Sequence, residues 1–284
     1  MRICAVALAL LLSGVAEATE VTDHFEWTDP LSNGVSGWEV SAGGSRFIAV
    51  TDGGWFLSGE IARTEGKISG VALRAADAIQ DHNGFPAAGR RVNDWGDAEG
   101  LAQTTDGSLI VGFERWMHVG QFDDTSSVQT VLVGLPDFAD YAENRQIEAV
   151  AVHANGDIFA WPERPLIGDQ FDVFRHDGTR WHISGNITEL DGFSIVGADF
   201  AANGDLYILE RKLVLTQWWQ NRIRRVRKLN WAAPEVIWTG GLGDFYNLEG
   251  VAVIEGAPLR LLLVGDNNKR PNTPTDIVEI TLTQ

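Results

Sequence analysis

Cysteine is almost absent from this chain of 284 residues, since Cys4 is the only one. It lies in an N-terminal segment that we expect to be removed, so the mature protein has no disulfide, thiolate nucleophile or cysteine–metal site. Basic residues are also few: 22 Lys and Arg stand against 39 Asp and Glu, a formal charge of −17. This excess of acid argues against nucleic acid and anionic membrane surfaces as main partners, because both select basic faces.

Several catalytic motifs are missing too. The six histidines form no H-x-H or H-E-x-x-H pattern, which disfavours a zinc site. No G-x-S-x-G segment is present, which disfavours a serine hydrolase built on a nucleophile elbow. Beyond the N-terminal segment we expect no membrane span, because no apolar run approaches the roughly 20 residues that a spanning helix needs. A content of 44% hydrophobic and 21% charged residues is nevertheless typical of a globular protein.

The N-terminal segment 1–18 has the layout of a secretory signal peptide. After a positive start, Ile3–Leu12 is an apolar run, and the sequence AEA then places small residues at a cleavage site. Such a site and the absence of disulfides suit a bacterial periplasm. We therefore expect the mature protein to be a periplasmic or secreted monomer. Residues 19–284 are expected to form a single β-propeller domain.

The rest of the chain repeats one pattern: Glu-Gly-apolar-Ala, a turn with Gly, an apolar strand and a charged pair. The clearest copy is DAEGLAQTTDGSLIVGFER at 97–115, followed by QIEAVAVHANGDIFAWPER at 146–164. Less regular copies are IVGADFAANGDLYILER at 195–211, NLEGVAVIEGAPLRLLLVGDN at 247–267 and VSGWEVSAGGSRFIAVTDGG at 35–54. Intervals of about 50 residues between copies are typical of propeller blades. When the copies are aligned on the Glu of the Glu-Gly-apolar-Ala pattern, that position is occupied by Ser36, Glu99, Glu148, Val196 and Glu249.

Each unit has the pattern of a four-stranded antiparallel sheet. Asp106-Gly107, Asn155-Gly156 and Asn203-Gly204 are turn dipeptides suited to tight hairpins. The sequence therefore predicts an all-β chain, a β-propeller of five four-stranded antiparallel blades. The last unit has three clear strands, so Val21–Trp27 is expected to pair with it and close the ring. Ile79–Trp95 is predicted as a loop over one mouth of the channel, with a sixth blade as the alternative.

Acidic side chains recur at two points of the repeat and should gather around the channel. Residues beside the inner hairpins of all blades meet near one axis, so Glu99, Glu148 and Glu249 are expected to form one ring. Arg115, Arg164 and Arg211 each follow an acid of a second ring. That ring is expected to hold Asp52, Glu114, Glu163, Glu210 and Asp266.

So many carboxylates around one axis oppose one another's ionisation and have to be neutralised. In one interpretation each Arg pairs with an acid of its own or the next blade, and the ring is a structural staple. In the other, hard cations such as Ca²⁺, which takes six to eight oxygen ligands, bind there and hold a phosphate or polarise a carbonyl oxygen. The sequence leaves both open. The candidate ligands of such an ion are Asp52, Asp97, Glu99, Glu148, Glu249 and Asp266.

The segment DAEGLAQTTDGSLIVGFER, with the later EAVAVHANGDIFAWPER and LEGVAV, resembles the bacterial phytase-like family, also described as having esterase-like activity of phytase. The resemblance covers roughly residues 34–283 and implies an exported propeller. It also implies a Ca²⁺-dependent phosphoester or carboxylester hydrolase, with a small-molecule substrate bound at one mouth of the channel. The D-x-D-D-P-A run expected of true propeller phytases is missing, which argues against phytate. The predicted catalytic residues are Glu99, Glu114, Arg115, Glu148, Glu163, Arg164, Glu210 and Arg211.

Two other functions stay open. A propeller with this charge pattern can bind a ligand or a protein without catalysis, and tight binding without turnover would indicate it. A lactonase-type propeller also uses Glu, Asn and Asp on a divalent ion, and Glu99, Asn267 and Asp266 are candidates for that role. The basic stretch Gln217–Trp231 is either a solvated outer strand or an anion- or partner-binding patch.

Overall fold

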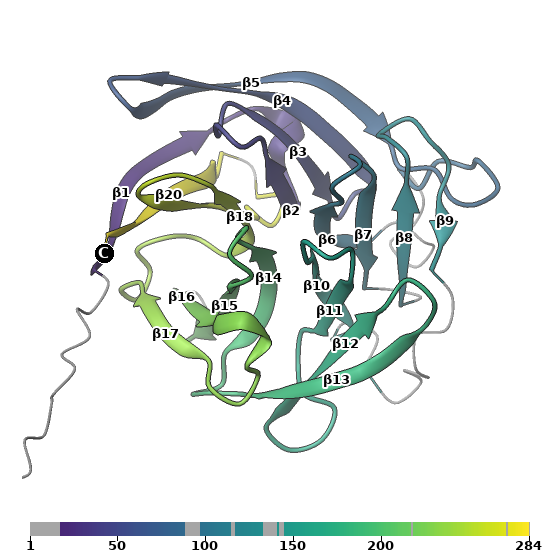
Figure 1. Cartoon of the computed structure of the whole chain (residues 1–284). Helices are drawn as coiled ribbons and strands as arrows, with labels where there is room; N and C mark the ends of the chain where they lie inside the picture. Colours follow the sequence, from purple (N-terminus) through teal and green to yellow (C-terminus); the bar gives the residue numbers. More distant parts are fainter. Residues whose placement is uncertain are drawn as a thin grey trace, which may run out of the picture.

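Twenty strands in the described residues form five four-stranded antiparallel sheets, arranged as blades around one channel (Figure 1). The prediction of an all-β propeller with five blades is therefore confirmed. The expected signal peptide lies outside the described residues, except for the backbone of Ala18. The computed structural model describes residues 18–88, 97–114, 117–132, 141, 145–216, 218–270 and 272–283.

In blades 1 to 4, four consecutive strands run from the channel to the rim. Blade 1 contains β2 (Val35–Val40), β3 (Arg46–Thr51), β4 (Trp55–Thr64) and β5 (Lys67–Ala78). Blade 2 contains β6 (Ala98–Gln103), β7 (Leu109–Phe113), β8 (His118–Phe122) and β9 (Thr130–Val131). Blade 3 contains β10 (Ile147–Val152), β11 (Ile158–Pro162), β12 (Gln170–His176) and β13 (Trp181–Thr188). Blade 4 contains β14 (Ser194–Phe200), β15 (Leu206–Val214), β16 (Trp218–Val226) and β17 (Glu235–Thr239).

Blade 5 joins the two ends of the chain. Its three inner strands are β18 (Leu248–Ile254), β19 (Leu259–Gly265) and β20 (Thr275–Thr283). The outer strand is β1 (Ala18–Trp27), which pairs antiparallel with β20 and lies beside it in Figure 1, purple next to yellow. The predicted closure of the ring is confirmed, and it removes the sheet edges that an open ring would expose.

Apolar side chains pack between neighbouring blades. All five residues of β7 are buried, because each sheet is covered by another sheet on either face. Trp38 and Trp161 are among the largest fully buried side chains, and the indole N–H of Trp38 donates to the carbonyl of Leu262 at 3.0 Å. This bond joins blade 1 to blade 5. Trp38 therefore supplies buried area between blades and satisfies its polar group there, whereas the indole N–H of Trp161 is buried without a hydrogen-bond partner among the described residues.

The glycine after the repeated Glu has a steric reason. A Cβ atom on Gly100 would lie 2.8 Å from the nitrogen of Val150 on the next inner strand. A Cβ on Gly250 would lie 2.8 Å from the carbonyl oxygen of Ser36, again on the next blade. Without side chains at these points the inner strands approach so closely that only about 10 Å³ of space is left in the middle of the channel.

The connection from blade 1 to blade 2 contains no strand in its described part, residues 79–88. Gln80 forms isolated bridges with Pro86 and Val128, so this segment lies against blade 2 as a loop, and residues 89–95 are not described. Two single turns of 3-10 helix, η1 (Pro30–Ser32) and η2 (Arg227–Leu229), lie between strands. No helix within the described residues is long and apolar enough to cross a membrane.

Candidate functional site

Every inner hairpin has a β-bulge at the same point, and it coincides with the repeated Glu. In blade 2 the register shifts between Ala98 and Gly100, which leaves Glu99 without a partner across the ladder. Glu148 and Glu249 are bulged in the same way. A bulge redirects a side chain away from the regular alternation of the strand. The residues at this point are Ser36, Glu99, Glu148, Val196 and Glu249.

All of these side chains except Val196 line a cavity of about 270 Å³ at one mouth of the channel. The wall is completed by the residue after the second strand of each blade. The Glu114 amide, for example, donates to the carbonyl of Asp97 at 3.0 Å, and the Asp266 amide to the carbonyl of Asn247 at 2.9 Å. The predicted ring of Glu99, Glu148 and Glu249 is brought together here. The full lining is Ser36, Asp52, Glu99, Glu114, Glu148, Glu163, Arg211, Glu249 and Asp266.

Blade 4 differs from the expectation, because Arg211 and not Glu210 lines the mouth. The inner hairpins of blades 2 and 4 have the same length, but the Glu-Arg pair of blade 4 comes one residue earlier in its strand: Gly107 and Gly156 precede Glu114 and Glu163 by seven positions, whereas Gly204 precedes Glu210 by six. One residue of shift turns a strand side chain to the opposite face. Counting from the turn glycine would have revealed this, but alignment on the Glu-Arg pair conceals it.

Glu210 is instead fully buried inside blade 4 between two arginines of β16. Its Oε2 lies 2.6 Å from Nε of Arg222 and its Oε1 lies 2.5 Å from Nη2 of Arg224. Burial raises the pKa of Glu210, and the two guanidinium groups oppose that shift. Three arginines of the basic stretch, Arg222, Arg224 and Arg225, are buried and form neither a solvated face nor an anion patch, whereas Arg227 and Lys228 are exposed.

Arg211 is the arginine of the repeat that acts as the predicted staple. It forms an ion pair with Glu249 of blade 5, and its Nη2 lies 3.7 Å from Oε1 of Glu163 in blade 3. It also donates to Oδ1 of Asn247 at 2.9 Å and lies over the ring of Trp219. Arg164 does not share this role, because it donates to the carbonyl of Gly192 at 3.1 Å, away from the cavity. Arg115 lies outside the described residues.

Blade 2 contributes three carboxylates that converge. Oxygens of Asp97, Glu99 and Glu114 all lie within 4.8 Å of one another. The sequence placed Asp97 and Glu99 among the metal ligands and Glu114 among the catalytic residues. The backbone pairing of Asp97 with Glu114 and the bulge at Glu99 are what bring these three together.

Burial and mutual repulsion disfavour ionisation at the mouth. Burial, and then the charges of Glu148 and Asp97, raise the pKa of Glu99 well above its usual range. The pKa of Glu148 is likewise raised by burial and by Glu163. Burial raises the pKa of Asp266 to about 6. The carboxyl groups of the mouth therefore hold their protons to higher pH than free carboxyl groups do.

Asp52 and Asn267 complete the blade 1 and blade 5 side. Oδ2 of Asp52 lies 2.8 Å from Nζ of Lys269, whereas its Oδ1 is buried without a hydrogen-bond partner. The side-chain Nδ2 of Asn267 donates to Oδ1 of Asn33 at 2.5 Å, and its Oδ1 accepts from the backbone N–H of Lys269 at 3.0 Å. Asn267 is therefore occupied in its loop and does not line the cavity.

The fold and the mouth together define a five-bladed propeller with an acidic pocket at one end of its channel. A family model described as Phytase-like: Esterase-like activity of phytase matches residues 31–269, and the chain belongs to this family. No curated protein matches the chain.

Solved structures with similar folds are distant in sequence. The PQQ-bound aldose sugar dehydrogenase from Streptomyces coelicolor is 12% identical, with a TM-score of 0.52 and coverage of 94% of this chain and 98% of that chain. A chain of a nidogen/laminin complex is 12% identical, with a TM-score of 0.48 and coverage of 89% and 87%. At such identity the first likeness shows the fold alone.

Proposed function

We propose that this protein is an exported Ca²⁺-dependent hydrolase of a phosphoester or carboxylester, with its site at the carboxylate-lined mouth. The observation that supports it is the asymmetry of the mouth. At equivalent positions, blade 2 has Glu99 and Glu114, whereas blade 4 has Val196 and Arg211. A structural staple would repeat around the ring. An asymmetric mouth instead suits catalysis. A cation held by the carboxylates can bind an ester oxygen, and a guanidinium group at the other side can neutralise the negative charge that develops on the substrate.

The donor set fits Ca²⁺, a hard ion that prefers carboxylate oxygens. Asp97, Glu99 and Glu114 would hold it, since their oxygens already converge. The buried Oδ1 of Asp52, which has no hydrogen-bond partner, is a further oxygen at the same mouth. When bound, Ca²⁺ supplies Lewis-acid polarisation of a carbonyl or phosphoryl oxygen.

The remaining side chains divide the other tasks. Arg211 is positioned by Glu249 and Glu163 and neutralises negative charge that develops on the substrate. The raised pKa of Glu148 suits it to act as the general acid that protonates a leaving alkoxide. Glu210 and Arg164 have no part in this chemistry, because both contact groups outside the cavity.

A calcium titration of chelator-treated mature protein tests the proposal. We expect saturable binding by calorimetry, a raised Tm, and hydrolysis of small esters or phosphoesters that chelation abolishes. Glu99→Gln should weaken binding by about tenfold or more, whereas the exposed Glu20→Gln is the matched control and should bind as the parent does. Absence of binding up to about millimolar Ca²⁺ would refute the proposal and favour an Arg-paired scaffold that binds a partner. Calcium binding without turnover of any ester would favour a ligand-binding propeller.

A further inference from the structure

A second hollow lies between blades 1 and 2, away from the acidic mouth. Its volume is about 390 Å³, within the range of small-molecule sites. It exists because β4 and β5 have 10 and 12 residues, whereas β8 and β9 of the facing blade have 5 and 2. The long outer strands β4 and β5 of blade 1 therefore extend beyond the short outer strands of blade 2 and are not fully covered by them. We call this hollow the interblade groove; its polar lining is Glu39, Arg46, Ser58, Glu60, Arg74 and Gln103.

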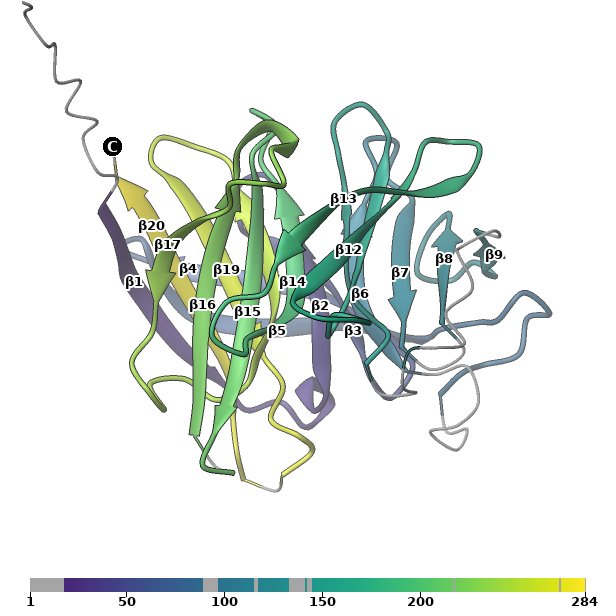
Figure 2. The ribbon, with the colours of Figure 1, turned by 90° about the horizontal axis from the view of Figure 1, so that it is seen from below.

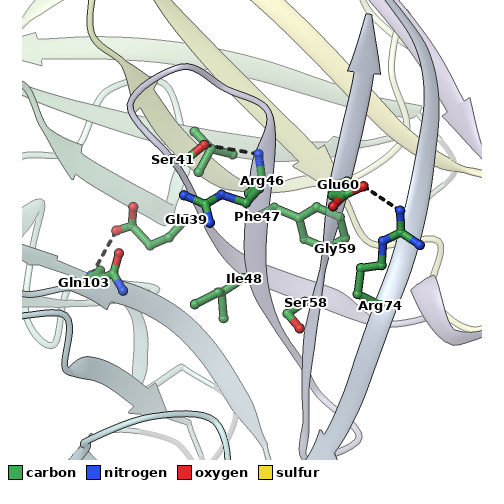
Figure 3. Close-up of a pocket in the computed structure, with 11 residues that line it drawn as sticks. Glu39, Ser41, Arg46, Phe47, Ile48, Ser58, Gly59, Glu60, Arg74 and Gln103 are labelled. Atoms are coloured by element: carbon green, nitrogen blue, oxygen red, sulfur yellow. Dashed lines mark hydrogen bonds and ion pairs between the residues drawn. The ribbon is translucent and has the colours of Figure 1, made fainter.

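Strand register explains why these side chains share one face. Ile48 of β3 lies opposite both Glu39 of β2 and Ser58 of β4. Arg46, two residues earlier in β3 and therefore on the same face, lies opposite Glu60 of β4. Figure 3 shows Glu39 on one side of the groove and Glu60 on the other, with Arg46 between them. The groove thus has a floor of Ile48 and Ser58 below a central guanidinium group.

One of the two cations in the groove, Arg46, has no ion pair with a described residue, although its charge acts on Glu60 at longer range. Arg74 and Glu60 neutralise each other, with Nη2 2.6 Å from Oε2. The Glu39 carboxyl accepts the backbone N–H of Gln103 at 3.2 Å, and burial raises its pKa well above the usual range. The guanidinium group of Arg46 forms no hydrogen bond or ion pair with any described residue. In a chain with a formal charge of −17, such a cation over a concave surface is a selective point for an anion.

We propose that the interblade groove binds a small polyhydroxylated carboxylate, such as a sugar acid. The carboxylate would form a bidentate pair with Arg46, for which a planar guanidinium group is suited. Hydroxyl groups of the ligand would bond to Ser58, Glu39 and Gln103 along the floor and the blade 2 wall. The site is independent of the proposed hydrolase, because the groove and the mouth share no lining residue.

Calorimetry with sodium D-glucuronate in calcium-free buffer tests this site. Calcium-free buffer keeps a bound cation at the mouth from attracting the probe, and the loss of heat in Arg46→Gln assigns binding to the groove. We expect saturable binding that Arg46→Gln weakens by about tenfold or more, as expected for loss of a charged hydrogen bond. Arg180→Gln removes the same charge from an exposed turn and should bind as the parent does. Neutral D-glucose should bind at least about tenfold more weakly than D-glucuronate.

Any of the following results would overturn the proposal: no saturable binding up to about 10 mM probe, equal affinity of Arg46→Gln and the parent, or equal affinity for glucose. Glu99→Gln separates the two sites, because it should leave glucuronate binding unchanged while it weakens Ca²⁺ binding. Loss of glucuronate binding in Glu99→Gln would place the probe at the mouth and also refute the groove. Both outcomes are independent of whether the protein hydrolyses any ester.

Discussion

Arg211 forms an ion pair with Glu249 across the boundary between blades 4 and 5. The same guanidinium group approaches Glu163 of blade 3, so one cation serves acids of both neighbouring blades. It occupies the place that Glu114 and Glu163 hold in their own blades, which makes it the cation among seven lining carboxylates. The charge balance of the mouth therefore depends on this residue more than on any acid.

Replacing Arg211 by Gln should separate its structural and functional effects. The metal-free protein should melt at a lower temperature, because Glu249 and Glu163 lose their counter-charge. Ca²⁺ should bind several-fold more tightly, since the ion no longer meets a nearby positive charge. Ester turnover should fall by about 100-fold if the guanidinium group stabilises developing charge.

Arg164→Gln is the matched control for this variant, because it makes the same charge change outside the cavity. Calorimetry, thermal melting and an ester assay on both variants check the prediction. Indistinguishable calcium affinities for the two variants would show that Arg211 does not act on the mouth.

Two Glu-to-Gln substitutions should have opposite effects on stability. Glu210→Gln removes the acid between Arg222 and Arg224 and should cost about 3–5 kcal/mol, because it leaves buried cations without their partner. Glu148→Gln should raise the Tm of the metal-free protein at neutral pH by a few degrees, because burial and Glu163 disfavour its charge. Urea unfolding and thermal melting in the presence of a chelator measure these two effects. Destabilisation of similar size in both variants would mean that Glu148 is a paired scaffold residue.

The fold could be predicted from the sequence because the repeat records the geometry of a blade. A turn glycine such as Gly107 marks the inner hairpin, and Gly100 marks the contact with the next inner strand. The orphan strand Val21–Trp27 and the incomplete last unit predicted the closure, which β1 and β20 confirm. Local signals of this kind can be recognised in a single sequence, because each blade repeats the same turns and contacts.

The site was predicted less completely, because its asymmetry depends on register. The Glu-Arg pair of blade 4 looks like those of the other blades, but it comes one residue earlier in its strand, so Glu210 and Arg211 lie on exchanged faces. The interblade groove gave no signal at all, because it depends on the different lengths of β5 and β9 in two separate blades. No local sequence motif predicts such a difference in strand length between two blades.

The contact between inner strands predicts a strict demand for glycine at position 100. Gly100→Ala places a Cβ 2.8 Å from a backbone nitrogen and 3.0 Å from the carbonyl oxygen of Glu148, neither of which can move freely. We expect a loss of about 1–3 kcal/mol and weaker Ca²⁺ binding, since Glu99 and Glu148 would shift. Gly70→Ala in β5 is the control, because nothing lies within 4 Å of its added Cβ. Equal urea midpoints for the two variants would contradict the packing argument.

The raised pKa values at the mouth predict an unusual pH dependence for the metal-free protein. Asp266 has a pKa of about 6 in the folded state against 3.8 for the free group, so the folded state binds more protons between these values. The free energy of unfolding therefore falls as pH rises from ~4 and levels off above the folded pKa, and Asp266 alone accounts for about 3 kcal/mol. Glu99 and Glu148 act in the same direction.

Denaturant unfolding at ~pH 5 and ~pH 8 with a chelator should therefore show lower stability at the higher pH. Saturating Ca²⁺ should remove or reverse this difference, because the ion favours the ionised carboxylates that high pH produces. Asp266→Asn should flatten the metal-free profile, while Asp106→Asn should not, since Asp106 lies in an exposed turn. A metal-free protein whose stability rises between these two pH values would mean that the carboxylates of the mouth are already neutralised by fixed cations. In that case the mouth would be a staple of the propeller, and neither Ca²⁺ nor an ester would be needed to explain it.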